Sequence, residues 1–147
     1  MSTTSAVILI IVIADLCFMF FVVRAIVSSN YSPLADDFPS DAIPPDAIYR
    51  RRQSFAFGLL NLGFSLAVAL DERAVHLKPE PWARWMGIRP VSIPRETIRA
   101  IGKPRSKLMM HEFRIERPSG SVIELRGPGW LWEALSRDQA DQRSDPV

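Results

Sequence analysis

The sequence is poor in the residues that build disulfide frameworks, metal sites and many catalytic centres. It has one cysteine and two histidines among its 147 residues. A single cysteine allows no disulfide within the chain and no zinc site made of several cysteine ligands. The sequence also lacks glycine-rich phosphate-binding loops and the G-x-S-x-G nucleophile motif. We therefore expect no catalytic residue, no metal ion and no cofactor, and predict that the protein is not an enzyme.

The N-terminus lacks the features of a cleaved targeting signal. A secretory signal peptide begins with basic residues and ends in a small-residue cleavage site, whereas no Lys or Arg precedes Arg24 and no A-x-A pattern follows the apolar run. A lipoprotein signal requires a small residue before the modified cysteine, but Leu16 precedes Cys17. We therefore expect the apolar run to remain on the mature protein.

This apolar run is long enough to cross a membrane. Residues 6–23 are apolar at every position except Asp15, and the run continues past Arg24 to Val27. As a helix it spans roughly 33 Å, about the thickness of a bilayer's hydrocarbon core. Asp15 costs on the order of 3 kcal/mol at a helix centre, and the surrounding large apolar side chains offset this cost. A buried helix of a soluble domain is the alternative, but small domains rarely bury so uniform a helix. The sequence predicts a transmembrane anchor over residues 1–27.

The basic residues indicate how the anchor is oriented. None precedes the apolar run, whereas Arg24 closes it and Arg50, Arg51 and Arg52 follow. Because short segments rich in Lys and Arg stay in the cytoplasm, we expect a single-pass protein of the inner (cytoplasmic) membrane. Its C-terminal domain is then cytoplasmic.

Asp15 has no cation one helical turn away, since its neighbours there are Ile11, Val12, Phe18 and Met19. An ionisable residue at mid-membrane is a candidate functional residue. Asp15 either makes a contact within the membrane, to a partner protein or to a second copy, or is a tolerated protonated carboxyl. The sequence leaves these two interpretations open.

Residues 28–49 predict a linker. They hold four prolines and four aspartates, no base and no hydrophobic periodicity. We expect an extended, partly polyproline II segment with a reach of about 25–30 Å.

Residues 50–137 predict an antiparallel β domain. Apolar residues alternate from Leu60 to Leu70, which is typical of a strand, although residues 55–70 could also form a short second membrane helix. His76 is expected on the outward face of the next strand. A hairpin is predicted over residues 112–125, with its turn at Pro118-Ser119-Gly120.

The rest of the domain adds one strand and one helix. Residues 91–93 predict a short strand, and residues 94–101 fit either a two-turn helix or a turn that leads into a strand. Residues 130–137 predict a terminal helix, followed by a polar tail over residues 138–147. The fold class is therefore α+β: an N-terminal transmembrane helix and a small antiparallel β-barrel or sandwich with a C-terminal helix.

This order of elements resembles the pleckstrin-homology-like topology. The region from Ser54 to Ile98 is also similar to uncharacterised small bacterial single-pass membrane proteins that share a pattern L-x-L, R-x-x-G-x-x-P, I-P-x-x-x-I. An aromatic residue is common after the Ile-Pro pair, where this chain has Arg95. The resemblance implies a pleckstrin-homology-like β domain and no known activity. The matching residues are Leu77, Arg84, Gly87, Pro90, Ile93, Pro94 and Ile98.

The charge distribution suggests a function in binding. Between Arg50 and Lys107 there are twelve bases and four acids, a net charge of 12 − 4 = +8. This surface is either simply solvated or contacts anionic lipid, where each base contributes about 1 kcal/mol. Amphipathic tryptophans beside bases suit a lipid or protein contact, and we expect no nucleic-acid partner. We predict a membrane-anchored binding module; the alternative is an accessory subunit of a membrane complex that uses Asp15. The candidate lipid- or partner-binding residues are Arg50, Arg51, Arg52, Trp82, Arg84, Trp85 and Arg89.

Overall fold

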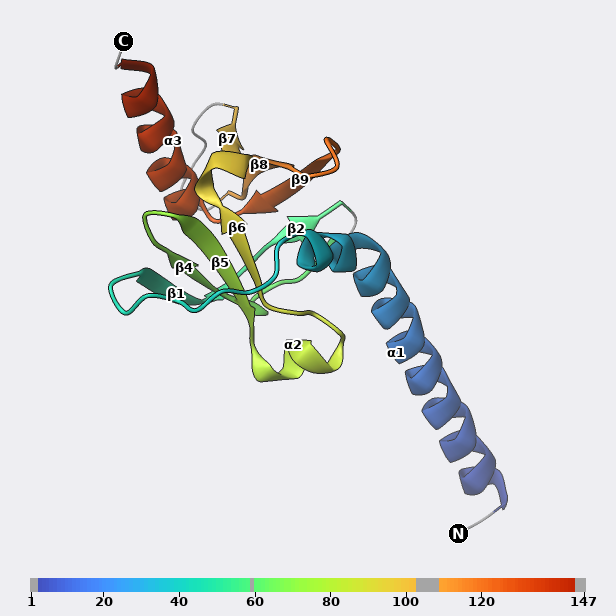
Figure 1. The fold of residues 1–147 in the computed structure, drawn as a ribbon. Helices are drawn as coiled ribbons and strands as arrows, with labels where there is room; N and C mark the ends of the chain where they lie inside the picture. The colour runs from blue at the N-terminus through green and yellow to red at the C-terminus, as the bar shows by residue number, and fades with distance from the viewer. Residues whose placement is uncertain (1–2, 59, 103–108, 145–147) are drawn as a thin grey trace.

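The computed structural model describes residues 3–58, 60–102 and 109–144 and has an α+β fold (Figure 1). A long N-terminal helix, α1 (Thr3–Asp37), leads into two antiparallel sheets, and helix α3 (Gly129–Ser144) ends the described chain. The predicted α+β class, with an N-terminal helix, antiparallel strands and a C-terminal helix, is thus confirmed. The two sheets do not close into a barrel.

The strands divide into a four-stranded and a five-stranded sheet. The first sheet has the order β1 (Ile48–Gln53), β4 (Leu66–Leu70), β5 (Ala74–Pro79) and β6 (Val91–Pro94). The second has the order β3 (Leu60–Asn61), β2 (Ala56–Phe57), β9 (Val122–Gly127), β8 (His111–Glu116) and β7 (Ile98–Ile101). A short helix, α2 (Pro81–Trp85), joins β5 to β6, and a 3-10 turn (Arg95–Thr97) precedes β7.

Several local predictions are confirmed. The predicted hairpin is β8–β9, in which Phe113 lies opposite Leu125, and the strand at residues 91–93 is β6. Residues 94–101 form a turn and a strand, so the second of the two interpretations is correct. Residues 55–58 and 60–70 contain β2, β3 and β4, so the described part of this stretch is not a second membrane helix.

The alternation from Leu60 to Leu70 is not one continuous strand. Gly63, at a φ of 52°, interrupts it between β3 and β4. The side chain of Phe64 is 71% exposed, although its even-numbered position predicts burial. Within β4, Ala67 and Ala69 are buried as well as the larger residues. A central strand covered on both faces carries no reliable alternation signal.

The predicted linker is wrong over its first part, because α1 continues through Pro33 to Asp37. Val27, Tyr31 and Leu34 follow one another at helical spacing, and each is completely buried. Burying such side chains stabilises by about 1.5–3 kcal/mol each. Together they exceed the roughly 3 kcal/mol that a proline costs inside a helix.

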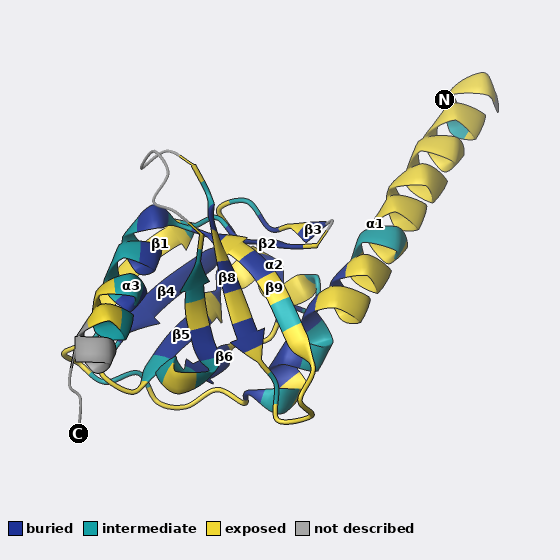
Figure 2. Ribbon diagram, turned by 90° about the horizontal axis from the view of Figure 1, so that it is seen from above, coloured by how far each residue is buried: buried dark blue, intermediate teal, exposed yellow. Residues whose placement is uncertain are grey.

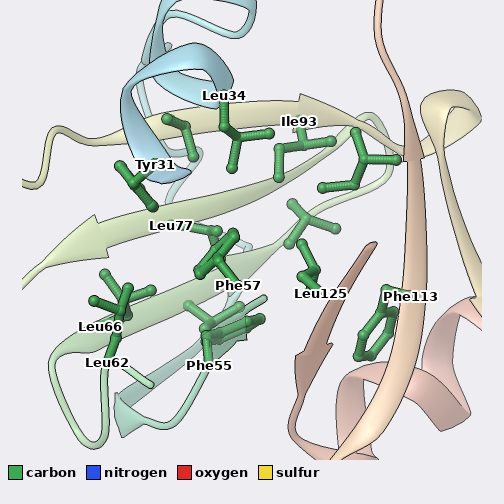
Figure 3. Packing of buried hydrophobic residues seen from close by; sticks show 14 of the residues in the cluster. Tyr31, Leu34, Phe55, Phe57, Leu62, Leu66, Leu77, Ile93, Phe113 and Leu125 are labelled. Carbon is green, nitrogen blue, oxygen red and sulfur yellow. The ribbon is translucent and has the colours of Figure 1, made fainter. Parts of the chain in front are cut away.

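The core lies where α1 meets the two sheets. Figure 3 shows Tyr31 and Leu34 of α1 above Leu77 and Phe57, which come from different sheets. The rings of Tyr31 and Phe57 meet edge to face, with centroids 5.3 Å apart. The C-terminal section of α1 is therefore part of the domain.

The terminal helix is longer than predicted. Helix α3 continues to Ser144, so residues 138–144 of the predicted polar tail are helical, and residues 145–147 lie outside the described part. Leu131 and Leu135 are buried. The indole N–H of Trp132 donates to the carbonyl oxygen of Ile101 at 3.0 Å. These contacts hold α3 against the second sheet.

Candidate functional site

The N-terminal section of α1 projects away from the domain as an exposed apolar rod (Figure 2). Its large apolar side chains are exposed to solvent: Ile10 is 66% exposed and Phe21 is 67% exposed. Within the described residues, α1 is the only helix long and apolar enough to cross a membrane. Exposing so much apolar surface to water is unfavourable, and a bilayer removes that cost.

Asp15 lies exposed within this rod. Among the residues that the structure describes, its carboxylate has no hydrogen-bond or ion-pair partner. A lone carboxyl on an apolar helix is costly in hydrocarbon. Asp15 therefore retains the two interpretations that its sequence context allows.

Helix α2 lies at the end of the domain from which the rod emerges (Figure 1). Pro81 occupies its first turn, where the missing N–H of proline is harmless. Ala83 faces the core and is fully buried, whereas Trp82 and Trp85 are 54% and 80% exposed. The guanidinium of Arg24 donates to the carbonyl oxygen of Trp85 at 3.3 Å. Helix α2 thus lies beside the last apolar turn of the rod.

Phe64 belongs to the same end of the domain. The backbone N–H of Glu80, which precedes α2, donates to the carbonyl oxygen of Ser65 at 2.8 Å. This bond places the backbone next to Phe64, whose side chain is exposed, beside the start of α2. We call Phe64, Trp82 and Trp85 the aromatic end. Sequence reasoning found the two tryptophans but missed Phe64, because its position in the alternation assigned it to the core.

Three of the five predicted binding arginines, Arg50, Arg51 and Arg89, make contacts within the molecule. Lys103, Arg105 and Lys107 of the predicted basic stretch lie outside the described residues. The guanidinium of Arg50 lies 4.7 Å from the ring centroid of Trp130. Arg51 binds both carboxylate oxygens of Glu80, at 2.8 and 3.3 Å. The hydrogen bond from Arg51 is the main cause that holds the pKa of Glu80 below its ordinary value. Arg52 adopts a left-handed backbone conformation at φ 54° within β1.

Arg89 is paired within the molecule, whereas Arg84 is exposed. Arg89 forms an ion pair with Asp36 at 2.6 Å, so it fastens the end of α1 to the loop before β6. Arg84 is exposed on α2, between the two tryptophans. The seven predicted binding residues therefore do not form one free basic surface. Of them, Trp82, Arg84 and Trp85 are brought together on α2.

His76 does not face solvent as predicted; it is only 4% exposed. Its Nε2 lies 3.0 Å from a carboxylate oxygen of Asp71, and its Nδ1 lies 2.8 Å from the hydroxyl of Ser92. The Ser92 hydroxyl also accepts the backbone N–H of Asp41 at 2.8 Å. The segment after α1 covers this side of the sheet, and the bridge between Pro39 and Val91 extends the contact.

The hydrogen-bonded residues Asp71, His76 and Ser92 are the residue types of a catalytic Ser-His-Asp triad, but the serine is not accessible to a substrate. Ser92 is 5% exposed, and its oxygen is held by the N–H of Asp41. Burial raises the pKa of Asp71, but hydrogen bonds from His76 and from two backbone amides outweigh it and hold that pKa below its ordinary value. The arrangement ties a covering segment to the sheet. Among the described residues, no three of His, Cys, Asp and Glu gather closely enough to hold a metal ion.

A broad hollow of about 800 Å³ lies at the other end of the domain, between β7 and α3. Charged side chains of both signs line it, including Glu72, Glu96, Arg99 and Arg114. A surface with both signs of charge suits a polar protein segment. Figure 1 shows β7 and α3 at the opposite end of the domain from α2.

The comparisons with known proteins give no relative on which to base a function. No protein-family model, no curated protein and no solved structure matches this chain.

Proposed function

We propose that this protein is a membrane-anchored, non-enzymatic binding module that holds its β domain in a fixed orientation at the cytoplasmic face of the inner membrane. One observation carries the proposal. Helix α1 passes without a break from an exposed apolar rod into the core of the domain. The sequence pattern that includes Arg84, Gly87 and Pro90 resembles that of small bacterial membrane proteins, and this resemblance favours the same assignment.

The unbroken helix bears on how such a module would work. A flexible linker would leave the domain free to rotate, and a partner would have to order it on binding. Here Val27, Tyr31 and Leu34 fix the domain to the anchor before any partner arrives. Preorganisation of this kind lowers the entropic cost of association. The charged hollow beside α3 would then face away from the membrane, toward soluble or membrane-bound partners.

The non-enzymatic part of the proposal is supported by the geometry of Ser92. Its hydroxyl is buried and already accepts the N–H of Asp41, so it cannot reach a substrate without displacement of the covering segment. We expect a fluorophosphonate probe, which labels activated serines, to leave the full-length protein unmodified. Labelling of Ser92 would show that this part of the proposal is wrong.

The membrane anchor can be tested with cysteine chemistry, because Cys17 is the single cysteine and lies in the apolar rod. We expect Cys17 in sealed bacterial membrane vesicles to resist a membrane-impermeant maleimide. A Cys17→Ala/Ser119→Cys variant places the thiol on the β8–β9 turn instead. It should react in inside-out vesicles and not in right-side-out vesicles. Reaction of Cys17 without detergent, or extraction of the protein by carbonate, would refute the anchor.

Asp15 favours a second candidate function, that of an accessory subunit of a larger membrane complex. Its carboxyl is exposed on the rod, where a hydrogen bond to another helix would satisfy it. We expect mild-detergent purification of the full chain to retain either a stoichiometric partner or a second copy. Asp15→Leu should release that partner, whereas Asp15→Asn, which keeps hydrogen-bonding groups, should retain it better. Association of Asp15→Leu that is unchanged from the wild type would exclude Asp15 as the contact.

A further inference from the structure

We propose that the aromatic end, formed by Phe64, Trp82 and Trp85, lies in the headgroup region of the same bilayer that α1 crosses. The domain then touches the membrane at a second place, beside its anchor. This inference rests on the proposed membrane anchor and adds the surface of the domain that meets the lipid.

The position of α2 relative to the rod places the aromatic end at the right height. Arg24 is the first basic residue of the chain and directly follows the apolar residues 6–23, and arginine near the end of a membrane helix lies at the interface. Its guanidinium donates to the carbonyl oxygen of Trp85 at 3.3 Å. The C-terminal end of α2 is therefore level with the point where α1 leaves the hydrocarbon.

The side chains at this end have the composition of a membrane interface. Phe64 is 71% exposed, Trp82 54% and Trp85 80%, although aromatic side chains of this size are usually mostly buried. The other two tryptophans of the chain pack against the domain instead: Trp132 is buried and Trp130 is partly buried. Tryptophan is enriched at the headgroup level because its ring is apolar and its N–H is polar.

The charges at this end favour lipid over a basic or apolar protein surface. Helix α2 carries one charged residue, Arg84, and no acid. The carboxylate of Glu80, the residue that precedes α2, pairs with Arg51 at 2.8 Å. Arg84 and Arg24 therefore flank the tryptophans with positive charge, which suits phosphate groups. The aromatic side chains should hold the end in place even in a membrane of zwitterionic lipid.

The test uses the full-length protein in nanodiscs of phosphatidylcholine that is brominated near the headgroup end of its acyl chains. Bromine quenches tryptophan fluorescence at contact. We expect marked quenching of the wild type and loss of most of it in Trp82→Phe/Trp85→Phe. Equal quenching of the two proteins, or no quenching of the wild type, would overturn the inference. Shielding of Trp82 and Trp85 from a soluble quencher in native membranes but not in nanodiscs would also overturn it, because it would indicate a protein partner.

Two further variants, made in the Trp82→Phe/Trp85→Phe protein, keep the test independent of protein folding. Phe64→Trp should restore quenching. Val122→Trp should not, because Val122 lies beside the β8–β9 turn, where Arg117 pairs with Asp37 at the domain end of α1. Maleimide protection of Cys17 in the same nanodiscs reports the anchor separately. Protected Cys17 with unquenched Trp82 and Trp85 refutes this inference alone, whereas reactive Cys17 refutes the anchor itself.

Discussion

Replacement of Leu34 by alanine tests whether α1 and the β domain are one folded unit. Leu34 is completely buried among residues of the sheets and lies near Ile93 (Figure 3). Removing a buried leucine side chain costs about 2–5 kcal/mol, from lost burial and from the cavity that remains. If residues 28–37 were instead a solvated linker, the same substitution would change the free energy of unfolding by less than about 0.5 kcal/mol. The two descriptions therefore differ several-fold in one measurable quantity.

The assay is urea unfolding of the full-length protein in detergent micelles, followed by tryptophan fluorescence. With an m value of about 1–3 kcal/mol/M, Leu34→Ala should lower the urea midpoint by roughly 1 M or more. Leu16→Ala is the matched control: the same truncation is made on the same helix, but at a position 65% exposed on the rod. It should leave the midpoint of the β domain unchanged. Equal midpoints for Leu34→Ala and the wild type would refute the integration of α1 into the core.

Two other substitutions test the hydrogen bonds among Asp71, His76 and Ser92 and the packing of Gly127 against Phe55. Asp71→Asn removes the ionisable carboxylate beside His76. The pKa of Asp71 is lowered in the folded state, so the ionised carboxylate stabilises the fold. This stabilisation is complete above the ordinary Asp pKa of about 4 and is lost as pH falls through the lower pKa of the folded state. The difference in urea midpoint between wild type and Asp71→Asn should thus be larger at pH 7 than at pH 3; a difference that grows in acid would contradict this assignment. Gly127→Ala would place a Cβ 2.6 Å from a ring carbon of Phe55. Such overpacking costs about 1–3 kcal/mol, so the thermal midpoint should fall, whereas an unchanged midpoint would show that the ring moves aside freely.

The parts of the fold that could be predicted from the sequence are those with strong local signals. The apolar run, the β8–β9 hairpin and the start of α3 depend on periodicity and turn residues within short windows. The error at residues 28–37 has a specific cause. Pro33 and the aspartates predict a linker, whereas the helical spacing of Val27, Tyr31 and Leu34 predicts a helix. The helix forms because these three side chains are buried against the sheets. The contacts that stabilise this part of α1 come from the sheets, which are distant in the sequence, so a short stretch of sequence does not reveal them.

The candidate site shows the same division between local and long-range information. Trp82, Arg84 and Trp85 are close in sequence, so their shared position on α2 could be predicted. The proximity of Trp85 to Arg24, 61 residues away, could not. His76 was misplaced for a related reason, because its partner Ser92 lies on the neighbouring strand at an opposing position. A histidine that alternates outward can still be buried when a separate segment covers that face.

Two attachments to a membrane restrict a domain more than one does. A single helix rigidly joined to the domain fixes its height, but the domain can still tilt with the helix, and membrane helices tilt over a wide range. A second contact at the aromatic end would oppose tilting in one direction, because tilting away would withdraw Trp82 and Trp85 from the headgroups. The proposed second contact therefore narrows the range of tilt, and it keeps the charged hollow between β7 and α3, at the opposite end of the domain from α2, turned away from the membrane (Figure 1).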